Sequence, residues 1–373
     1  MIYLDYSANT PVDPEVLSVF CETERRFPGN TNSTHPAGQA ARAELLRVTA
    51  SVAGMLGMRP EEIIFTSGAS ESNNLAIKGI AQASRHTGRH MISTALEHAS
   101  VGGSLSALQQ QGWEVDLIRI GRDGKLDLEQ LRELLRKDTV LLSVSAVDSE
   151  LGVVQPLKEI AELLKDYPGC RLHVDATQAV GKTELNLEGV DTLSAAPHKF
   201  YGLNGSGLLV KRRELMIEPQ IHGGTSATLY RSGTPALALA ASAEKALSLA
   251  LEHQTERVNY VRRLNMWLRD RLADYPRVRI NSPADAVPHI LNLSVLGVKG
   301  TEFQRRLAEK DVCVSVKSAC SVEGTPSKAV FAVSRDRKNA LCSWRISLSH
   351  LTAQGELARF MESFEEIYKE LAQ

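Results

Sequence analysis

The chain has 373 residues, of which 43% are hydrophobic, with 43 Lys and Arg against 44 Asp and Glu. This length predicts more than one hydrophobic core, and the balanced charge argues against a surface dedicated to nucleic acid or membrane. The five cysteines lack CxxC spacing, so we expect no metal site. No apolar run of membrane-spanning length and no secretory signal stands out, so we expect a cytoplasmic protein.

Short apolar runs alternate with helical patterns between about residues 60 and 210. The expected strands include 62–66, 90–93, 140–144, 172–175 and 207–210, and the expected helices include 127–137 and 157–166. This β-α-β rhythm predicts a large, doubly wound, mainly parallel sheet. Ligands of such a sheet bind beyond the carboxyl ends of its strands.

The rest of the chain predicts a smaller α+β domain. An Ala-rich stretch, 235–272, has the pattern of one or two long helices, followed by strands at 290–295 and 344–348 and helices at 300–310 and 353–371. We therefore divide the chain into an N-terminal arm (1–15) that packs with the small domain, a large domain (16–250), and a small domain (251–373) that carries a cysteine loop.

Lys199 and Asp175 form the most informative pair in the sequence. Lys199 lies in Ser-Ala-Ala-Pro-His-Lys-Phe-Tyr-Gly, and Asp175 ends the strand of His-Val-Asp-Ala-Thr-Gln, 24 residues earlier. Pyridoxal phosphate chemistry needs such a pair, because the amine forms a Schiff base with the cofactor and the carboxylate keeps its pyridine nitrogen protonated. A solvated lysine and an ordinary strand-end aspartate are the alternative, and the pair alone leaves both open.

A second pattern indicates a phosphate site. Residues 66–74 (Thr-Ser-Gly-Ala-Ser-Glu-Ser-Asn-Asn) follow a strand and open a helix. Backbone N–H groups at such a helix start, together with the Ser70 hydroxyl, form a cradle for phosphate. A plain serine-rich N-cap is the alternative, but with Lys199 and Asp175 in the same chain we favour the phosphate.

Three polar residues near these motifs are further candidates. His98 ends a short strand, where it could stack on a flat ring and transfer protons near pH 7, or could simply be a helix cap. Gln178 could bond the phenolic oxygen of the cofactor or be an exposed amide. His198, next to Lys199, could reach the phosphate.

Cys320 and Arg345 are candidates on the substrate side. Cys320 lies in a stretch of small and polar residues (315–326) that is typical of a mobile loop, with Lys317 close in sequence. An accessible thiol near positive charge is suited to thiolate chemistry. Arg345, in a strand, could clamp a substrate carboxylate or form a structural ion pair.

Motifs spread along nearly the whole chain resemble the cysteine desulfurases, the NifS/IscS-like branch of the class-V aminotransferase family. The segments that carry this resemblance are 3–13, Gly29-Asn30 with His35 and Gly38, 65–79, 150–156, 173–182, 198–199, 231–234 and 318–320. Each is weak alone, but their order and spacing are specific. The resemblance implies the type I pyridoxal phosphate fold and a homodimer with its site at the subunit interface.

The resemblance also implies a role for each candidate. Lys199 would carry the cofactor, His98 would stack on it, and Asp175 and Gln178 would hold the ring. The phosphate ligands would be Ala69, Ser70, His198 and, from the other subunit, Thr234. Cys320 would take sulfur from L-cysteine as a persulfide, release alanine and pass the sulfur to an acceptor protein for iron–sulfur cluster assembly or tRNA thiolation. Arg345 and Ser149 would bind the substrate.

Three positions depart from the family pattern. Asp148 and Ser149 replace two asparagines, Ala196 replaces a serine that would bond the phosphate, and Asn9 replaces a threonine. We expect weaker cofactor retention or slower turnover. The alternatives are a selenocysteine lyase or related β-elimination enzyme, in which Cys320 matters less, and a weakly active homologue that acts as a sulfur-pathway partner.

Overall fold

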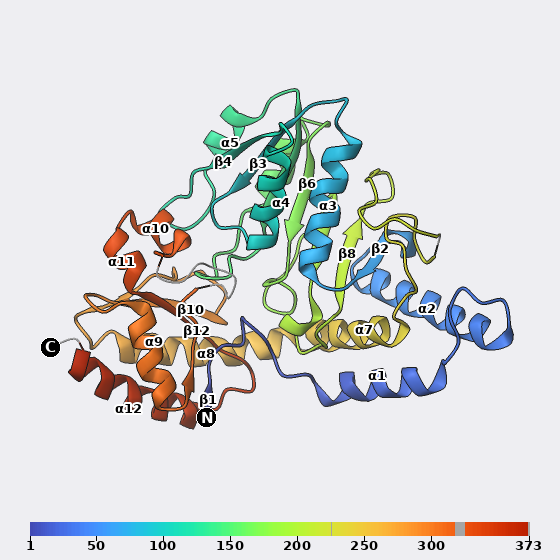
Figure 1. Ribbon diagram of the computed structural model, residues 1–373. Helices are drawn as coiled ribbons and strands as arrows, with labels where there is room; N and C mark the ends of the chain where they lie inside the picture. The colour runs from blue at the N-terminus through green and yellow to red at the C-terminus, as the bar shows by residue number, and fades with distance from the viewer. Residues whose placement is uncertain (225, 318–324, 372–373) are drawn as a thin grey trace.

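The computed structural model describes residues 1–224, 226–317 and 325–371, and its largest sheet has seven strands (Figure 1). Their order across the sheet is β2-β8-β7-β6-β5-β3-β4. The strands are β2 (Ile63–Thr66), β3 (His90–Thr94), β4 (Glu114–Ile118), β5 (Thr139–Ser145), β6 (Arg171–Asp175), β7 (Thr192–Ala195) and β8 (Gly207–Lys211).

Most neighbours in this sheet run parallel. The pairs β3–β4, β3–β5, β5–β6 and β6–β7 are parallel, and only β8 runs against both of its neighbours, β7 and β2. The prediction of a large, mainly parallel sheet is therefore confirmed. The antiparallel β8 follows β7 through a short connection, which a parallel crossover would not allow.

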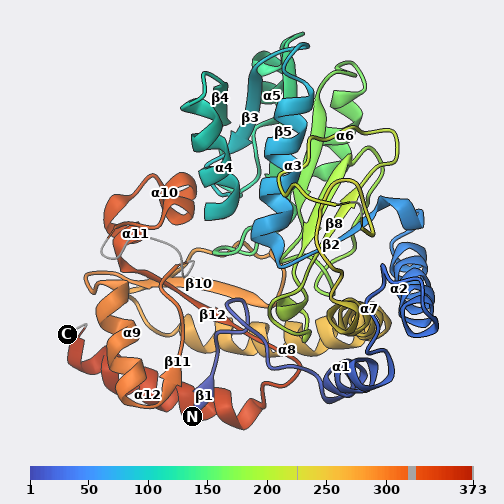
Figure 2. The same ribbon diagram turned by 45° about the vertical axis from the view of Figure 1, so that its right-hand side comes forward.

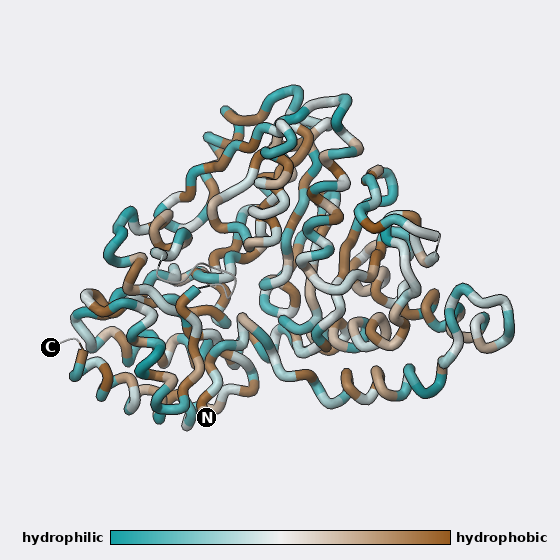
Figure 3. The backbone as a smooth tube through the Cα atoms, viewed as in Figure 1, coloured by the Kyte–Doolittle hydropathy of each residue, from teal (hydrophilic) through white to brown (hydrophobic). Residues whose placement is uncertain are grey.

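Helices cover the faces of the sheet. Helix α3 (Ala69–Ala83) packs across β5, β6, β7 and β8, with α4 (Ala99–Gln109) beside it (Figure 1). The connections after β4 and β5 contain α5 (Leu128–Leu134) and α6 (Leu157–Leu164). Hydrophobic residues run along the strands, and hydrophilic ones gather in the turns at the upper end of the sheet in Figure 3.

Three further helices pack together at one side of the sheet. They are α1 (Pro14–Arg26), α2 (Pro36–Met55) and α7 (Leu237–Glu252), and a single turn of 3-10 helix, η1 (Pro60–Glu62), follows α2. The Ala-rich stretch forms two helices, α7 and α8 (Gln254–Leu272), which meet at His253. Figure 2 shows α8 leading from α7 beneath the smaller sheet.

The smaller sheet is antiparallel, in the order β12-β10-β9. It consists of β9 (Val278–Ile280), β10 (Ile290–Val295) and β12 (Ser343–Ser347), and its helices are α9 (Gly300–Glu309), α10 (Lys328–Ser334), α11 (Arg337–Cys342) and α12 (Gln354–Leu371). The core here is aromatic: the Trp344 ring stacks on Phe303, with a centroid distance of 5.1 Å.

The first residues of the chain join this smaller core. Strand β1 (Ile2–Tyr3) pairs in parallel with β11 (Val312–Cys313), and the side chains of Ile2 and Leu4 are buried there. The N-terminal arm thus runs from the smaller core toward the carboxyl ends of the large sheet. Within the residues that the structure describes, no helix combines the length and apolarity needed to cross a membrane.

Candidate active site

Parallel pairing brings the predicted lysine and aspartate to one edge of the sheet. Asp175 is the last residue of β6 and lies opposite Ser194 of β7. Lys199 follows β7 in a turn of 3-10 helix, η2 (Pro197–Lys199). His98 is the N-cap of α4, four residues after the end of β3. All three therefore lie beyond the carboxyl ends of parallel strands, where ligands bind in such folds.

The buried Asp175 carboxylate is held by two donors. Its Oδ2 accepts a hydrogen bond from Asn73 Nδ2 at 2.8 Å, and its Oδ1 accepts one from the backbone N–H of Thr177 at 3.0 Å. Asn73 comes from α3, which lies across the sheet. A carboxylate fixed in this way can pair with a protonated ring nitrogen without having to reorganise.

The surroundings of His98 favour its neutral form. Its Nδ1 accepts from the Ser100 hydroxyl at 2.8 Å and the Ser100 N–H at 3.2 Å. Burial lowers the pKa of His98, the Asp175 carboxylate partly opposes this shift, and the Lys199 ammonium adds to it. These electrostatic contributions also show that His98 lies near both residues.

The Lys199 amine contacts the N-terminal arm. Its Nζ donates to the backbone carbonyl of Ser7 at 2.8 Å and to that of Ala8 at 2.6 Å. The Gln178 side chain donates to the Ser7 carbonyl as well, at 2.9 Å. The arm thus reaches the amine that would bind the cofactor, a contact that no sequence motif indicates.

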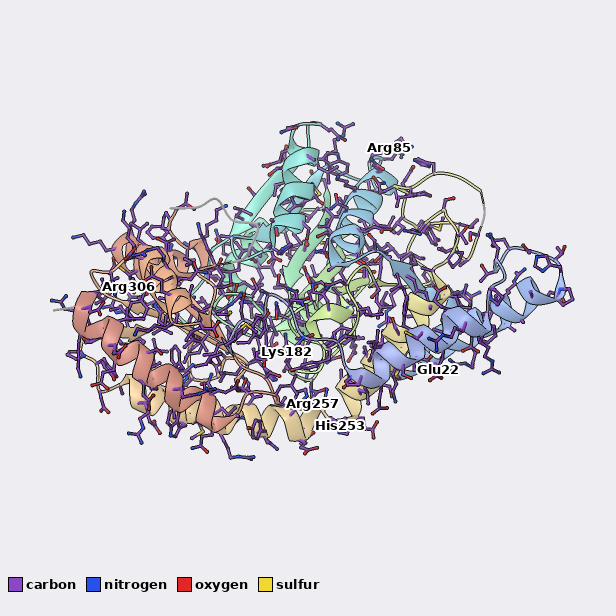
Figure 4. All side chains as sticks on the ribbon, turned by 60° about the horizontal axis from the view of Figure 1, so that its bottom comes forward. Glu22, Arg85, Lys182, His253, Arg257 and Arg306 are labelled. Atoms are coloured by element: carbon purple, nitrogen blue, oxygen red, sulfur yellow. The ribbon has the colours of Figure 1, made fainter. Side chains whose placement is uncertain are left out.

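A second lysine lies beside this group. Lys182 is buried and donates to Gln178 Oε1 at 2.7 Å, and burial together with the nearby Lys199 and Arg345 cations lowers its pKa to about 7. Figure 4 shows Lys182 in the middle of the molecule. No role for Lys182 could be predicted from the sequence, because a lysine in a turn after a glycine is normally solvated.

The predicted phosphate cradle lies at the start of α3. Gly68, at the N-cap, makes no side-chain capping bond, Ala69 begins the helix, and Ser70 is exposed. A Cβ added to Gly207 of the neighbouring β8 would lie 2.5 Å from Gly68 Cα, so the two backbones approach closely. An anion can therefore replace the missing cap.

His198 immediately precedes Lys199 in η2. It is partly buried, and burial together with the Lys199 and Lys182 cations lowers its pKa to about 4. A neutral imidazole can still donate one hydrogen bond to a phosphate oxygen. The amine, the aspartate and the uncapped helix start together fit pyridoxal phosphate.

Arg345 forms a buried ion pair in this structure. The residue is 2% exposed, Nη2 lies 3.0 Å from Asp5 Oδ1, and Nη1 donates to the backbone carbonyl of Ser149 at 2.7 Å. This is the structural ion pair that the sequence left open. Binding of a substrate carboxylate by Arg345 and Ser149 stays a prediction. In that case the Arg345 guanidinium would bind both the Asp5 carboxylate and the substrate carboxylate.

Two carboxyl groups near the site have a raised pKa: Asp148, which is buried and which the sequence marked only as a departure from the family pattern, and Glu97, which is half-buried. Burial, with help from Glu150, raises the pKa of Asp148 to about 7, and its Oδ1 has no hydrogen-bond partner among the described residues. Burial likewise raises the pKa of Glu97 to about 7, although Thr94 and Ser145 each donate to it at 2.7 Å.

Two predicted residues are not brought to this site by the described chain. Cys320 lies outside the described residues. The described residues before and after it contact each other, because Lys317 Nζ donates to the Thr325 hydroxyl at 2.6 Å. Ser315, just before them, forms a β-bridge with Arg345. Thr234 is exposed and lines a small pocket beside α1 that holds none of the other predicted site residues. No cluster of three potential metal ligands occurs in the ranges that the structure covers.

A lysine beyond a parallel sheet, with an aspartate at the end of the adjacent strand and an uncapped helix start, is the arrangement of a pyridoxal phosphate enzyme of the type I fold. The comparisons with known proteins agree. The family model for aminotransferase class-V matches residues 2–360. A NifS/IcsS protein homolog of Lactobacillus delbrueckii subsp. bulgaricus is 36% identical, over 99% of this chain and 97% of its own length.

Two further matches extend this likeness. Cysteine desulfurase IscS of Dechloromonas aromatica is 37% identical over 95% of this chain and 89% of its own length. The solved structure of a NifS-like protein superposes with a TM-score of 0.93 at 31% identity, covering 99% of this chain and 100% of the other. The chain belongs to the aminotransferase class-V family, in its NifS/IscS-like branch.

Proposed function

We propose that this protein is a cysteine desulfurase, which converts L-cysteine into L-alanine and passes the sulfur through Cys320 to an acceptor protein. The observation that carries the proposal is the convergence of Lys199, Asp175 and His98 at one edge of the sheet, with the described ends of the Cys320 loop next to Arg345. The relative named cysteine desulfurase IscS supports the choice of substrate.

The contacts described above support the following cofactor site. Lys199 would hold the cofactor, Asp175 and Gln178 would bond its ring nitrogen and phenolic oxygen, and His98 would stack on the ring. The proposed phosphate ligands are the N–H of Ala69, the hydroxyl of Ser70, the ring of His198 and Thr234 of a second subunit. When bound, pyridoxal phosphate supplies an electron sink for the substrate's α-carbon.

The protein's own groups then carry out the sulfur transfer. Arg345 and Ser149 bind the substrate, and the displaced Lys199 amine removes the α-proton. The Cys320 thiolate attacks the substrate sulfur, so that an S–S bond forms and the C–S bond breaks. The electron pair of the broken bond stays with the carbon fragment, which takes up a proton at its β-carbon, regains the α-proton from the Lys199 ammonium and leaves as alanine. Cys320 keeps the persulfide until an acceptor protein removes the sulfur.

Several surface features support a homodimer. Thr234 is exposed in the single chain, and close to it in sequence Leu229 is 72% exposed. The loop that contains Leu229 lines a cavity of about 830 Å³ together with residues of α2 and β2. A large apolar side chain exposed beside a cavity supports a contact with another subunit there. We infer that this loop packs against the second subunit and delivers Thr234 to its phosphate site.

The decisive experiment compares the wild-type protein with Cys320→Ser. With L-cysteine as substrate, we expect the wild type to form alanine and to carry a persulfide on Cys320, which mass spectrometry of the trapped thiol detects. Cys320→Ser should keep the yellow cofactor on Lys199 but lose persulfide formation. Cys21→Ser, on α1, is the matched control and should behave as the wild type.

The alternatives give different outcomes in the same experiment. Full release of sulfide by Cys320→Ser would identify a β-elimination enzyme such as a selenocysteine lyase. Cofactor binding without alanine formation in the wild type would identify an inactive homologue that serves as a partner in a sulfur pathway.

A further inference from the structure

A chain of hydrogen bonds connects Asp175 with His98 through two residues outside the predicted site. Asn73 of α3 donates from Nδ2 to Asp175 Oδ2 at 2.8 Å and to Ser100 Oγ at 2.9 Å. The Ser100 hydroxyl in turn lies 2.8 Å from His98 Nδ1. The chain thus links the residue that would hold the ring nitrogen with the residue that would stack on the ring.

Elementary hydrogen-bond chemistry fixes the direction of every link. An ionised carboxylate only accepts, so the Asn73 amide nitrogen must face Asp175, and its two hydrogens go to Asp175 and Ser100. Asn73 Oδ1 then accepts from His173 Nε2 at 3.0 Å, which leaves His173 Nδ1 to accept from the Thr192 hydroxyl at 2.9 Å. Asn73 and His173 are both fully buried, so water does not compete for these bonds.

The last link determines where His98 carries its hydrogen. Because the Ser100 oxygen already accepts from Asn73, its hydroxyl hydrogen is available for His98 Nδ1. The backbone N–H of Ser100 points at the same atom at 3.2 Å, and a backbone amide can only donate. Two donors therefore occupy Nδ1, whereas the structure records no partner for His98 Nε2 in the part of the chain that it describes.

We propose that Ser100, oriented by Asn73, is a positioning residue that holds His98 as the neutral tautomer with its hydrogen on Nε2. His98 then presents an N–H donor to the reacting groups. It does not act as a base through Nε2, because that nitrogen already carries a hydrogen. To become charged, His98 must take a proton at Nδ1 and lose both bonds from Ser100.

The proposal deepens the function proposed above, on which its catalytic meaning rests. If His98 can only donate, it serves the reaction by a hydrogen bond from Nε2–H to developing negative charge. Removal of the substrate's α-proton then belongs to Lys199. Asn73 bonds both Asp175 and Ser100. One buried side chain therefore orients Asp175 directly and His98 through Ser100, and both of these residues are expected to contact the cofactor.

Nitrogen NMR tests the tautomer directly in the holoenzyme. In protein with ¹⁵N-labelled histidine, the His98 signals are identified by their loss in His98→Gln. We expect a pyrrole-type shift at Nε2 and a pyridine-type shift at Nδ1 across neutral pH. A pyrrole-type shift at Nδ1 would overturn the proposal, whether or not the protein forms alanine, so its failure is distinct from failure of the proposed function.

Ser100→Ala removes one of the two donors to Nδ1. We expect the Nδ1 signal to move toward that of an unbonded pyridine-type nitrogen, and the midpoint of the His98 titration to rise by roughly 0.5–1 pH unit. Ser100→Thr keeps the hydroxyl and should restore both values. Ser104→Ala, which removes a hydroxyl one turn further along α4 that bonds the Ser100 carbonyl, is the matched control and should change neither. A Ser100→Ala protein with an unchanged His98 spectrum would refute the role of Ser100.

Discussion

At the scale of single residues, Asp148 has the least favourable environment near the site. The carboxyl group is buried, its Oδ2 accepts from the N–H groups of Glu150 and Leu151, and its Oδ1 has no partner among the described residues. The pKa of Asp148 is raised to about 7. Between about pH 4 and pH 7, this carboxyl group therefore keeps its proton in the folded protein but has lost it in the unfolded chain.

Asp148→Asn should therefore change how stability depends on pH. A raised pKa means that Asp148 destabilises the fold progressively as pH rises from about 4 to about 7. The amide cannot ionise, so we expect the variant to be more stable than the wild type at pH 8, by on the order of 2–4 kcal/mol, and equally stable at pH 4. Thermal unfolding at both pH values measures this. An equal difference at the two pH values would show that Asp148 does not titrate in this range.

Ala196 gives a second prediction at this scale. It is fully buried and immediately precedes the turn that carries His198 and Lys199. A hydroxyl placed there should bond the cofactor phosphate, and a bond to a charged group contributes about 1.5–3 kcal/mol. Ala196→Ser should thus slow cofactor release by roughly tenfold or more. Loss of cofactor absorbance on dialysis measures the rate, and equal retention would show that the phosphate lies out of reach.

The residues that the sequence predicted, and those that it missed, differ in one physical respect. Lys199, Asp175 and His98 could be predicted because their chemistry is set by position at strand ends. Lys182 and Asn73 could not, because their importance comes from burial and from partners distant in the chain. Arg345 lies between these cases: the strand was predicted, but its partner, Asp5, lies at the far end of the sequence.

At the scale of elements, the contact between β8 and the start of α3 shapes the phosphate cradle. A Cβ on Gly207 would lie 2.4 Å from Thr66 Oγ1 and 2.5 Å from Gly68 Cα, and much of this contact is with backbone. We expect Gly207→Ala to push the first turn of α3 away and to lower cofactor affinity, with a loss of about 1–3 kcal/mol of stability. Titration with pyridoxal phosphate measures the affinity.

Gly54→Ala is the control for this prediction. Gly54 lies near the end of α2, and an added Cβ would meet nothing within 4 Å. Alanine favours a helix over glycine, so this variant should be as stable as the wild type or slightly more stable. If Gly207→Ala binds the cofactor as tightly as Gly54→Ala, the close approach does not shape the cradle.

The elements themselves were predicted where burial gave a clear pattern. All five strands expected in the large sheet are present, because each is a mostly apolar run between turns. Strands β4 and β7 have no such pattern, since Glu-Val-Asp-Leu-Ile lies at the sheet edge with mixed polarity and Thr-Leu-Ser-Ala is short and polar. In both cases hydrogen bonding to an existing neighbour decides the structure, and a single segment of sequence does not contain that information.

At the scale of the whole molecule, the proposed dimer can be tested by mixing two inactive chains. Lys199→Ala removes the amine, and Thr234→Glu places a negative charge against the partner's phosphate. In a mixed dimer of the two variants, one site has both wild-type residues and the other has neither. We therefore expect about half of the wild-type alanine formation from mixed dimers, purified with two different tags.

The parent dimers serve as controls for this experiment, because each has two defective sites. Mixed dimers that are no more active than the mean of their parents would show that Thr234 acts within its own chain. A monomeric mass for the wild type in solution would contradict the shared site altogether.

The pairing of β1 with β11 affects the order of events during biosynthesis. The arm that contacts the Lys199 amine through Ser7 and Ala8 is anchored by bonds from Ile2 and Leu4 to Asp311 and Cys313. When a ribosome has made only the large sheet, the first residues of the chain have no strand to join. The nascent chain can therefore assemble its lysine, aspartate and histidine early, but the arm docks over them only after the segment around Val312 has emerged from the exit tunnel.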